Sequence, residues 1–93
     1  MTAAEFEQRR AAEIARLQRR LADIERHITA IERTAARRPE VARDAAQSLR
    51  LLERDRADVT AALRFNTDAQ QRAQRARDAI TRNRNTDRKG QKS

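Results

Sequence analysis

Large aliphatic side chains recur along the first part of the chain at alternating intervals of three and four residues. This spacing places them on one face of a helix, as the a and d positions of a heptad repeat. Most positions between them hold charged residues or alanine, which favour helices. The members of this first seam are Ile14, Leu17, Leu21, Ile24, Ile28, Ile31 and Ala35. Thr2 followed by Glu5 matches a capping box, so the pattern predicts a helix from about residue 3 to about residue 36.

A second seam with the same spacing follows. Its members are Ala42, Ala45, Leu49, Leu52, Arg56, Val59 and Leu63. Arg56 is the one charged residue among them. A long arginine stem can cover apolar surface while its guanidinium stays in water, so we expect Arg56 to reach the edge of the seam. The alternative is that Arg56 contacts a partner.

Beyond Leu63 this register meets polar residues, and another apolar stripe takes over. Its members are Phe65, Ala69, Ala73, Ala76 and Ile80. One interpretation is a continuous helix whose apolar face rotates, and the other is a break near residue 66 followed by a short third helix. Because neither Gly nor Pro occurs there, we favour a continuous helix from about residue 39 to about residue 82. Residues 83–93 contain no large apolar residue and are predicted to form a basic, flexible tail.

Pro39 determines how the two seams are arranged. Proline does not continue a helix from the preceding turn but suits the first position of a new one, and it moves the residue before it out of the helical region. We therefore expect a turn at residues 36–38 and an antiparallel, coiled-coil-like helical hairpin over residues 1–82. The alternative is a single long helix kinked at Pro39 in a coiled-coil dimer, because Ala35 and Ala42 are seven positions apart and keep the heptad phase.

The core expected for such a hairpin is thin. With the turn at this position, the numbers of facing residues should sum to about 73, which sets Leu21 against Leu52, and a register that sums to about 80 is the alternative. The large aliphatic members of the core are Ile14, Leu17, Leu21, Ile24, Ile28, Ile31, Leu49, Leu52, Val59 and Leu63. A lone two-helix hairpin has no second layer to cover its apolar face. We therefore expect a homo-oligomer in which hairpins assemble into a helical bundle.

The chain offers little for catalysis. It has no cysteine, one glycine and a single histidine, His27. Asp23 lies one turn before His27, but zinc needs three or four ligands, so we expect no metal site. No serine has a partnered base and no glycine-rich loop could hold a phosphate, so we expect neither an enzyme nor a cofactor or small-molecule substrate. With no apolar run near about 18 residues and no signal peptide, we expect a cytoplasmic protein that does not bind membranes.

The charge is unevenly distributed along the chain. The 93 residues carry 22 basic and 14 acidic side chains, for a net charge of +8. Residues 64–93 hold nine of the basic and three of the acidic residues, which gives this segment a charge of +6. A basic helical segment of this kind is typical of contacts with the phosphate backbone of nucleic acids. The expected contact residues are Arg64, Arg72, Arg75, Arg82, Arg84, Arg88, Lys89 and Lys92.

Together these features predict a non-catalytic helical oligomer that binds DNA or RNA mainly through phosphates. Phe65 is the one aromatic residue in the basic segment, so reading of single-stranded sequence is not expected. No helix-turn-helix motif is visible either. The alternative function is a structural or adaptor coiled coil that docks onto a protein partner, in which the charge serves only solubility.

Overall fold

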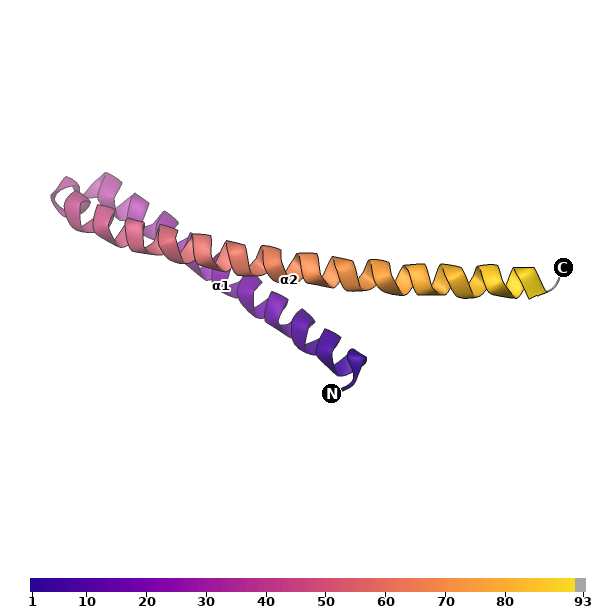
Figure 1. Ribbon diagram of the computed structural model, residues 1–93. Coiled ribbons are helices and arrows are strands. Elements are labelled where there is room, and N and C mark those ends of the chain that lie inside the picture. The colour runs from indigo at the N-terminus through magenta and orange to yellow at the C-terminus, as the bar shows by residue number, and fades with distance from the viewer. Residues whose placement is uncertain (92–93) are drawn as a thin grey trace.

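The computed structural model describes the backbone of residues 1–91 and the side chains of residues 1–84. Helix α1 spans Ala3–Arg37, the short 3₁₀ helix η1 spans Pro39–Val41, and helix α2 spans Ala42–Gln91. No strand occurs among these residues, which confirms the all-α fold class. Helix α2 turns back along α1 and continues past its N-terminal end, in a molecule that measures 79 × 26 × 15 Å (Figure 1).

The start of α1 is capped as its sequence predicts. Thr2 Oγ1 accepts a hydrogen bond from the backbone N–H of Glu5 at 3.1 Å, and the N–H of Phe6 donates to the Thr2 carbonyl at 3.0 Å. The bond to Thr2 Oγ1 gives a partner to one of the first amide groups of the helix, which have none within the helix itself. The helix therefore begins at Ala3.

The helical path is interrupted at Pro39, as predicted. Arg38, the residue before the proline, has φ −130° and ψ 84°, which lies outside the helical region. Its N–H still donates to the Thr34 carbonyl at 2.9 Å and so closes the last turn of α1. Pro39 then takes the first position of η1, where a backbone N–H would have no partner, and the Val41 N–H donates to the Arg38 carbonyl at 3.1 Å.

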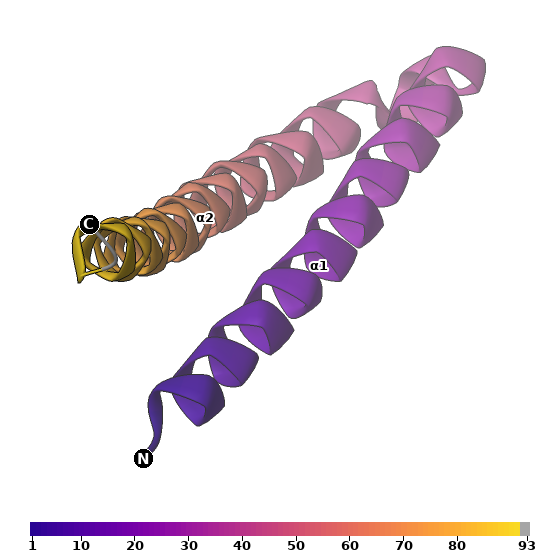
Figure 2. The ribbon, with the colours of Figure 1, turned by 90° about the vertical axis from the view of Figure 1, so that its right-hand side faces the viewer.

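Side chains of both predicted seams meet between α1 and α2, which lie side by side in Figure 2. Leu17, Ile24 and Ile28 of α1 form a buried cluster with Val59 of α2. The other large aliphatic members of the seams are half-buried: Ile14, Leu21, Ile31, Leu49, Leu52 and Leu63. Even Leu17 and Val59 keep 5% of their surface exposed. The described core is therefore a single layer of side chains between two helices.

Helix α2 is continuous through residue 66, so the favoured continuous helix is confirmed and the break is absent. Asn66 fits within the helix because its Nδ2 donates to the Ala62 carbonyl, one turn earlier, at 2.8 Å. Arg56 is exposed, which agrees with a stem that extends to the edge of the seam.

The stripe predicted beyond the second seam meets α1 only in part, because Ala69 and Ala73 are half-buried. Three members of the predicted stripe are exposed: Phe65, Ala76 and Ile80. The half-buried face instead continues the heptad of Val59, through Asn66 and Ala73 at seven-residue intervals. The reason lies in the first turns of α1, where small and polar side chains such as Glu7 and Ala11 face α2.

One contact bears on the register of the two helices. Arg10 Nη1 donates to the Ala69 carbonyl at 3.5 Å, and these residue numbers sum to 79, nearer the alternative register than the favoured one. Leu21 and Leu52, which the favoured register sets face to face, both pack against the buried cluster, so the facing pairs of the core stay a prediction. The reversal runs from the end of α1 at Arg37 to the start of α2 at Ala42, later than the expected turn at 36–38.

At its other end α2 extends to Gln91, past residue 83, where the flexible tail was expected to begin. The intervening sequence contains no proline, and its glycine, Gly90, comes only at the end, so nothing in it stops a helix that is already formed. Lys92 and Ser93 lie outside the described residues. Neither described helix combines the length and apolar character needed to cross a membrane.

Candidate nucleic-acid interface

Three arginines lie on one exposed face of α2, which we name the outer ridge: Arg64, Arg75 and Arg82. They are separated by 11 and 7 residues, close to whole numbers of helical turns, so they share one side of the helix. At a rise of about 1.5 Å per residue, they are spaced by about 16 and about 10 Å along the axis. Arg64 precedes Asn66 by two positions and Arg75 follows Ala73 by two, so both lie on the side of α2 opposite the seam.

Two arginines of α1, Arg16 and Arg26, are bound by acidic neighbours. Arg16 donates through Nε and Nη2 to the two carboxylate oxygens of Glu13, at 2.9 and 2.5 Å. These hydrogen bonds, together with the charge of Arg16, lower the pKa of the Glu13 carboxyl. About three turns further along, Arg26 forms an ion pair with Asp23, also three positions apart. Part of the positive charge of α1 is therefore matched locally.

Within the basic segment, four arginines with described side chains make no hydrogen bond or ion pair with another described residue: Arg64, Arg72, Arg75 and Arg84. Residues 64–84 contain six arginines and two aspartates, so the described part of the segment is strongly basic by itself. An exposed guanidinium without a protein partner keeps its donors available for an external anion.

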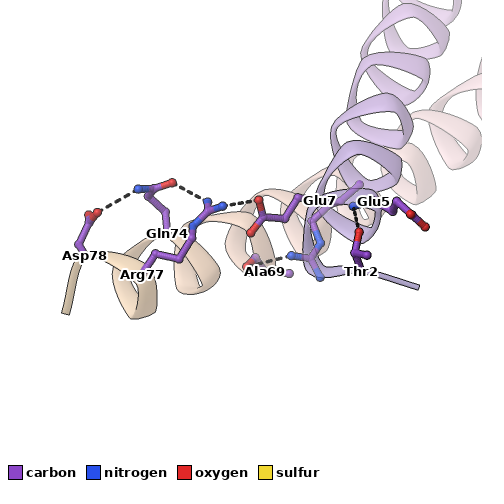
Figure 3. A network of polar contacts seen from close by, with 8 residues as sticks. Thr2, Glu5, Glu7, Ala69, Gln74, Arg77 and Asp78 are labelled. Atoms are coloured by element: carbon purple, nitrogen blue, oxygen red, sulfur yellow. Dashed lines mark hydrogen bonds and ion pairs between the residues drawn. The ribbon is translucent and has the colours of Figure 1, made fainter. Parts of the chain in front are cut away.

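Arg77 is the arginine of this segment that was not among the expected contacts, and it is bound to other side chains. Its guanidinium donates to the Glu7 carboxylate of α1 and to Gln74 Oε1, the latter at 2.6 Å. Gln74 Nε2 donates in turn to Asp78 at 3.0 Å, which completes the chain of contacts in Figure 3. Arg77 therefore connects the start of α1 to α2 and has part of its charge matched there.

Five of the eight expected contact residues have described side chains, and all five are exposed: Arg64, Arg72, Arg75, Arg82 and Arg84. Arg88 and Lys89 lie within α2, but their side chains are outside the described part of the chain. Lys92 lies outside it altogether. The interface can therefore be built only on the first five residues.

A cavity of about 570 Å³ opens between the N-terminal segment and the middle of α2, at the end of the helix pair away from Pro39. We name it the open-end cavity, and its lining residues are Met1, Phe6, Arg9, Arg10, Phe65, Asn66, Ala69 and Arg72. Phe6 and Phe65 are 53% and 69% exposed. Three arginines and no carboxylate line the cavity, so it combines apolar rings with positive charge.

Arg10 joins the two sides of the open-end cavity. Its guanidinium carbon lies 4.9 Å from the centroid of the Phe6 ring, which is a cation–π contact, and its Nη1 donates to the Ala69 carbonyl across the gap. Arg10 is half-buried as a result, whereas Arg9 and Arg72 are exposed. Arg10 thus orients the ring of Phe6, and the other two guanidinium groups stay open to solvent.

Phe6, Arg9 and Arg10 were not expected at this site. A register that sums to about 73 sets them opposite residues 63–67. A register with the sum of 79, as for Arg10 and Ala69, sets them opposite residues 69–73 instead, which brings them beside Arg72. No local pattern specifies where α2 lies beside α1, so no local signal could have revealed this cavity.

His27 lies at another cavity, of about 350 Å³, close to the turn. Asp44 and Ser48 line the same cavity, but no hydrogen bond joins the three side chains, so Ser48 is not activated as in a catalytic triad. Asp23, the expected neighbour of His27, pairs with Arg26 instead. Over residues 1–84, no group of three or more His, Asp or Glu side chains could hold a metal ion.

The chain matches no protein-family model, no curated protein and no solved structure with which it was compared. Its function is therefore inferred from the geometry and charge of its own residues. The basic segment of α2 and the open-end cavity are the two features that bear on function.

Proposed function

We propose that the protein is a non-catalytic helical oligomer that binds the phosphate backbone of nucleic acid through the basic C-terminal third of α2. The observation that carries this proposal is the set of exposed guanidinium groups without protein partners, Arg64, Arg72 and Arg75 among them. Arginines held by acids, as in the Arg16–Glu13 pair, have much of their charge already matched. Arg64, Arg72 and Arg75 keep theirs for an external polyanion.

The chemistry of the outer ridge suits phosphate better than it suits base edges. A guanidinium group offers several N–H donors in one plane and binds phosphate oxygens in a bidentate manner. Duplex DNA carries about one negative charge per 1.7 Å of its axis, so a phosphate lies within reach of each arginine of the ridge. Contacts of this kind set position and affinity but carry little sequence preference.

The proposal includes the assembly of the chain. We propose that α1 and α2 act as an antiparallel, coiled-coil-like hairpin and that copies of it associate into a bundle. The single-layer core supports this, because two helices alone leave apolar side chains in water. Leu51 of α2 is a large apolar side chain that does not belong to the described core and is 57% exposed. A second copy could cover it.

A second candidate function rests on the same exposed side chains. Leu51 and Ile80 are 57% and 55% exposed, and either could contact a protein partner of a different kind. The protein would then be a structural or adaptor coiled coil, and its charge would serve solubility. The two candidates differ in whether the binding partner is a polyanion.

The test is nucleic-acid binding by fluorescence anisotropy, with labelled duplex DNA and RNA over a series of salt concentrations. We expect affinity to fall by roughly 0.9 log units per log unit of salt for each phosphate contact on duplex DNA. The variant Arg64→Gln/Arg75→Gln should weaken binding to every sequence alike and make the salt dependence shallower, because it removes two ridge contacts.

The matched control is Arg16→Gln/Arg26→Gln, which removes the same net charge from arginines that are already paired with Glu13 and Asp23. We expect it to bind almost as the unaltered protein does. Equal losses in the two double variants would show that binding follows total charge and not the ridge. No binding to any nucleic acid at low salt would overturn the proposal and favour the adaptor.

A further inference from the structure

We propose that the open-end cavity holds an unpaired base of a single-stranded nucleic acid, stacked on Phe65, so that the protein prefers single strands to duplexes. This inference rests on the proposed function and adds the class of nucleic acid. It concerns the cavity lined by Phe6 and Phe65 together with Arg9, Arg10 and Arg72.

The rings provide the surface for stacking. Phe65 is the more exposed of the two phenylalanines at 69%, and it is not part of the hydrophobic cluster between the helices. A planar apolar ring in water beside basic side chains is the arrangement by which many proteins bind unpaired bases without sequence preference. Phe6, which is 53% exposed, lines the same cavity from the other side.

The arginines divide into two roles. Arg10 covers one side of the Phe6 ring and is bound to the Ala69 carbonyl, so it positions the ring and the cavity wall. Arg9 and Arg72 are exposed, one on each helix, and have no hydrogen-bond or ion-pair partner among the described residues. They are the groups that can bind the phosphates on either side of a stacked base.

The charge around the cavity identifies its occupant. No carboxylate lines it, and Arg72 belongs both to the cavity and to the basic segment of α2, so a bound strand can continue toward Arg75. A second copy of this chain, with a net charge of +8, is a poor occupant because it carries the same sign. A duplex is also a poor occupant, because its bases are already paired and stacked.

The experiment compares single-stranded and duplex oligonucleotides of equal length on the full chain. In Phe65→Ala we expect single-strand affinity to fall about tenfold, since stacking on one ring is lost, while duplex affinity stays unchanged. Ile80→Ala is the matched control, because Ile80 is an exposed apolar residue of α2 that does not line the cavity. It should bind both forms as the unaltered protein does. Circular dichroism verifies that each variant keeps its helix content.

Phe65→Trp gives a second, direct readout. The chain contains no tryptophan, so the introduced tryptophan would be the single source of tryptophan fluorescence and would lie at the cavity. A single-stranded oligonucleotide should quench its fluorescence by stacking, and Phe65→Trp should retain the affinity that Phe65→Ala loses. Salt should weaken the complex in the same titration, because Arg9 and Arg72 contribute through charge.

The outcomes separate this inference from the function on which it rests. If Phe65→Ala binds single strands as the unaltered protein does while Arg64→Gln/Arg75→Gln weakens both forms, the stacking inference fails and phosphate binding stands. If no nucleic acid binds at low salt, both fail. If an acidic peptide quenches Phe65→Trp and a single strand does not, the cavity binds protein and this inference is overturned.

Discussion

Glu7 and Arg77 lie 70 positions apart in the sequence and form an ion pair across the open end of the two helices. Arg77 also donates to Gln74, so the pair connects the second turn of α1 to a short network on α2. The open-end cavity lies beside this network, with Arg10 contributing to its lining. The pair therefore holds the first turns of α1 near α2, where the apolar seam has already ended.

We expect the Glu7–Arg77 pair to contribute little to stability. The two side chains are 36% and 47% exposed, and exposed ion pairs typically contribute about 0.2–1 kcal/mol. A double-mutant cycle with Glu7→Gln and Arg77→Gln, measured by chemical unfolding, should give a coupling energy in that range that shrinks at high salt. A coupling several times larger would mean that the pair is far better shielded from water than its exposure indicates.

The central core should be much more sensitive. Ile24 is 6% exposed and belongs to the buried cluster with Leu17, Ile28 and Val59. Ile24→Ala should destabilise the fold by about 2–5 kcal/mol, and Ile24→Asp should abolish most helix content because it buries an unpaired charge. Circular dichroism measures both. The exposed Ile80→Asp is the control and should remain helical, and equal losses at the two positions would argue against the described core.

Self-association should be visible as concentration dependence. If copies of the chain cover the exposed Leu51, helix content and melting temperature should fall on dilution. Leu51→Glu should lower the mass in solution, measured by light scattering, while the core around Val59 stays intact. A monomeric mass with melting that does not depend on concentration would exclude the proposed oligomer.

Truncation tests the far end of α2. Deleting residues 83–93 removes Arg84, Arg88, Lys89 and Lys92 against one acid, Asp87, a loss of three net positive charges. The segment holds no large apolar side chain, so the melting temperature should change little. Binding to nucleic acid should weaken for all sequences and its salt dependence should become shallower. Unchanged affinity would restrict the interface to residues 64–82.

Acid should weaken α1 through Glu13. Its pKa lies below the ordinary 4.5 because the ionised carboxylate accepts hydrogen bonds from Arg16. The unfolded chain therefore takes up this proton first as the pH falls, so the stabilisation is complete above pH 4.5 and is lost as the pH drops through the lowered pKa. Melting temperatures over the acidic range should decline less steeply in Glu13→Gln. Identical profiles for the two proteins would mean that the pair does not affect folding.

The features that depend on local sequence could be predicted. Thr2 caps α1 because an N-cap involves only residues three positions apart, and Pro39 interrupts the helix because proline lacks an N–H wherever it stands. The burial of Leu17 and Val59 follows from heptad spacing, which is also a local pattern.

Features that depend on how the two helices face each other were missed. The contacts of Phe6 and Arg10 at the open end depend on where α2 lies beside α1, which no local pattern specifies. The rotated apolar face was expected because Phe65 and Ile80 are apolar, but both side chains are exposed on α2. The open-end cavity is lined by residues of the N-terminal segment and of α2 together, so it could not be predicted from either segment alone.

The length of the molecule has an electrical consequence. It extends over 79 Å, whereas the field of an exposed charge decays over about 8 Å at physiological ionic strength. Residues 30–50, which surround the turn, hold five arginines and three acids, while residues 64–84, a segment of equal length, hold six arginines and two aspartates. The turn end is thus the less basic of the two and too remote to influence the more basic end. A polyanion in solution would attract the molecule by one tip and orient it before any contact forms.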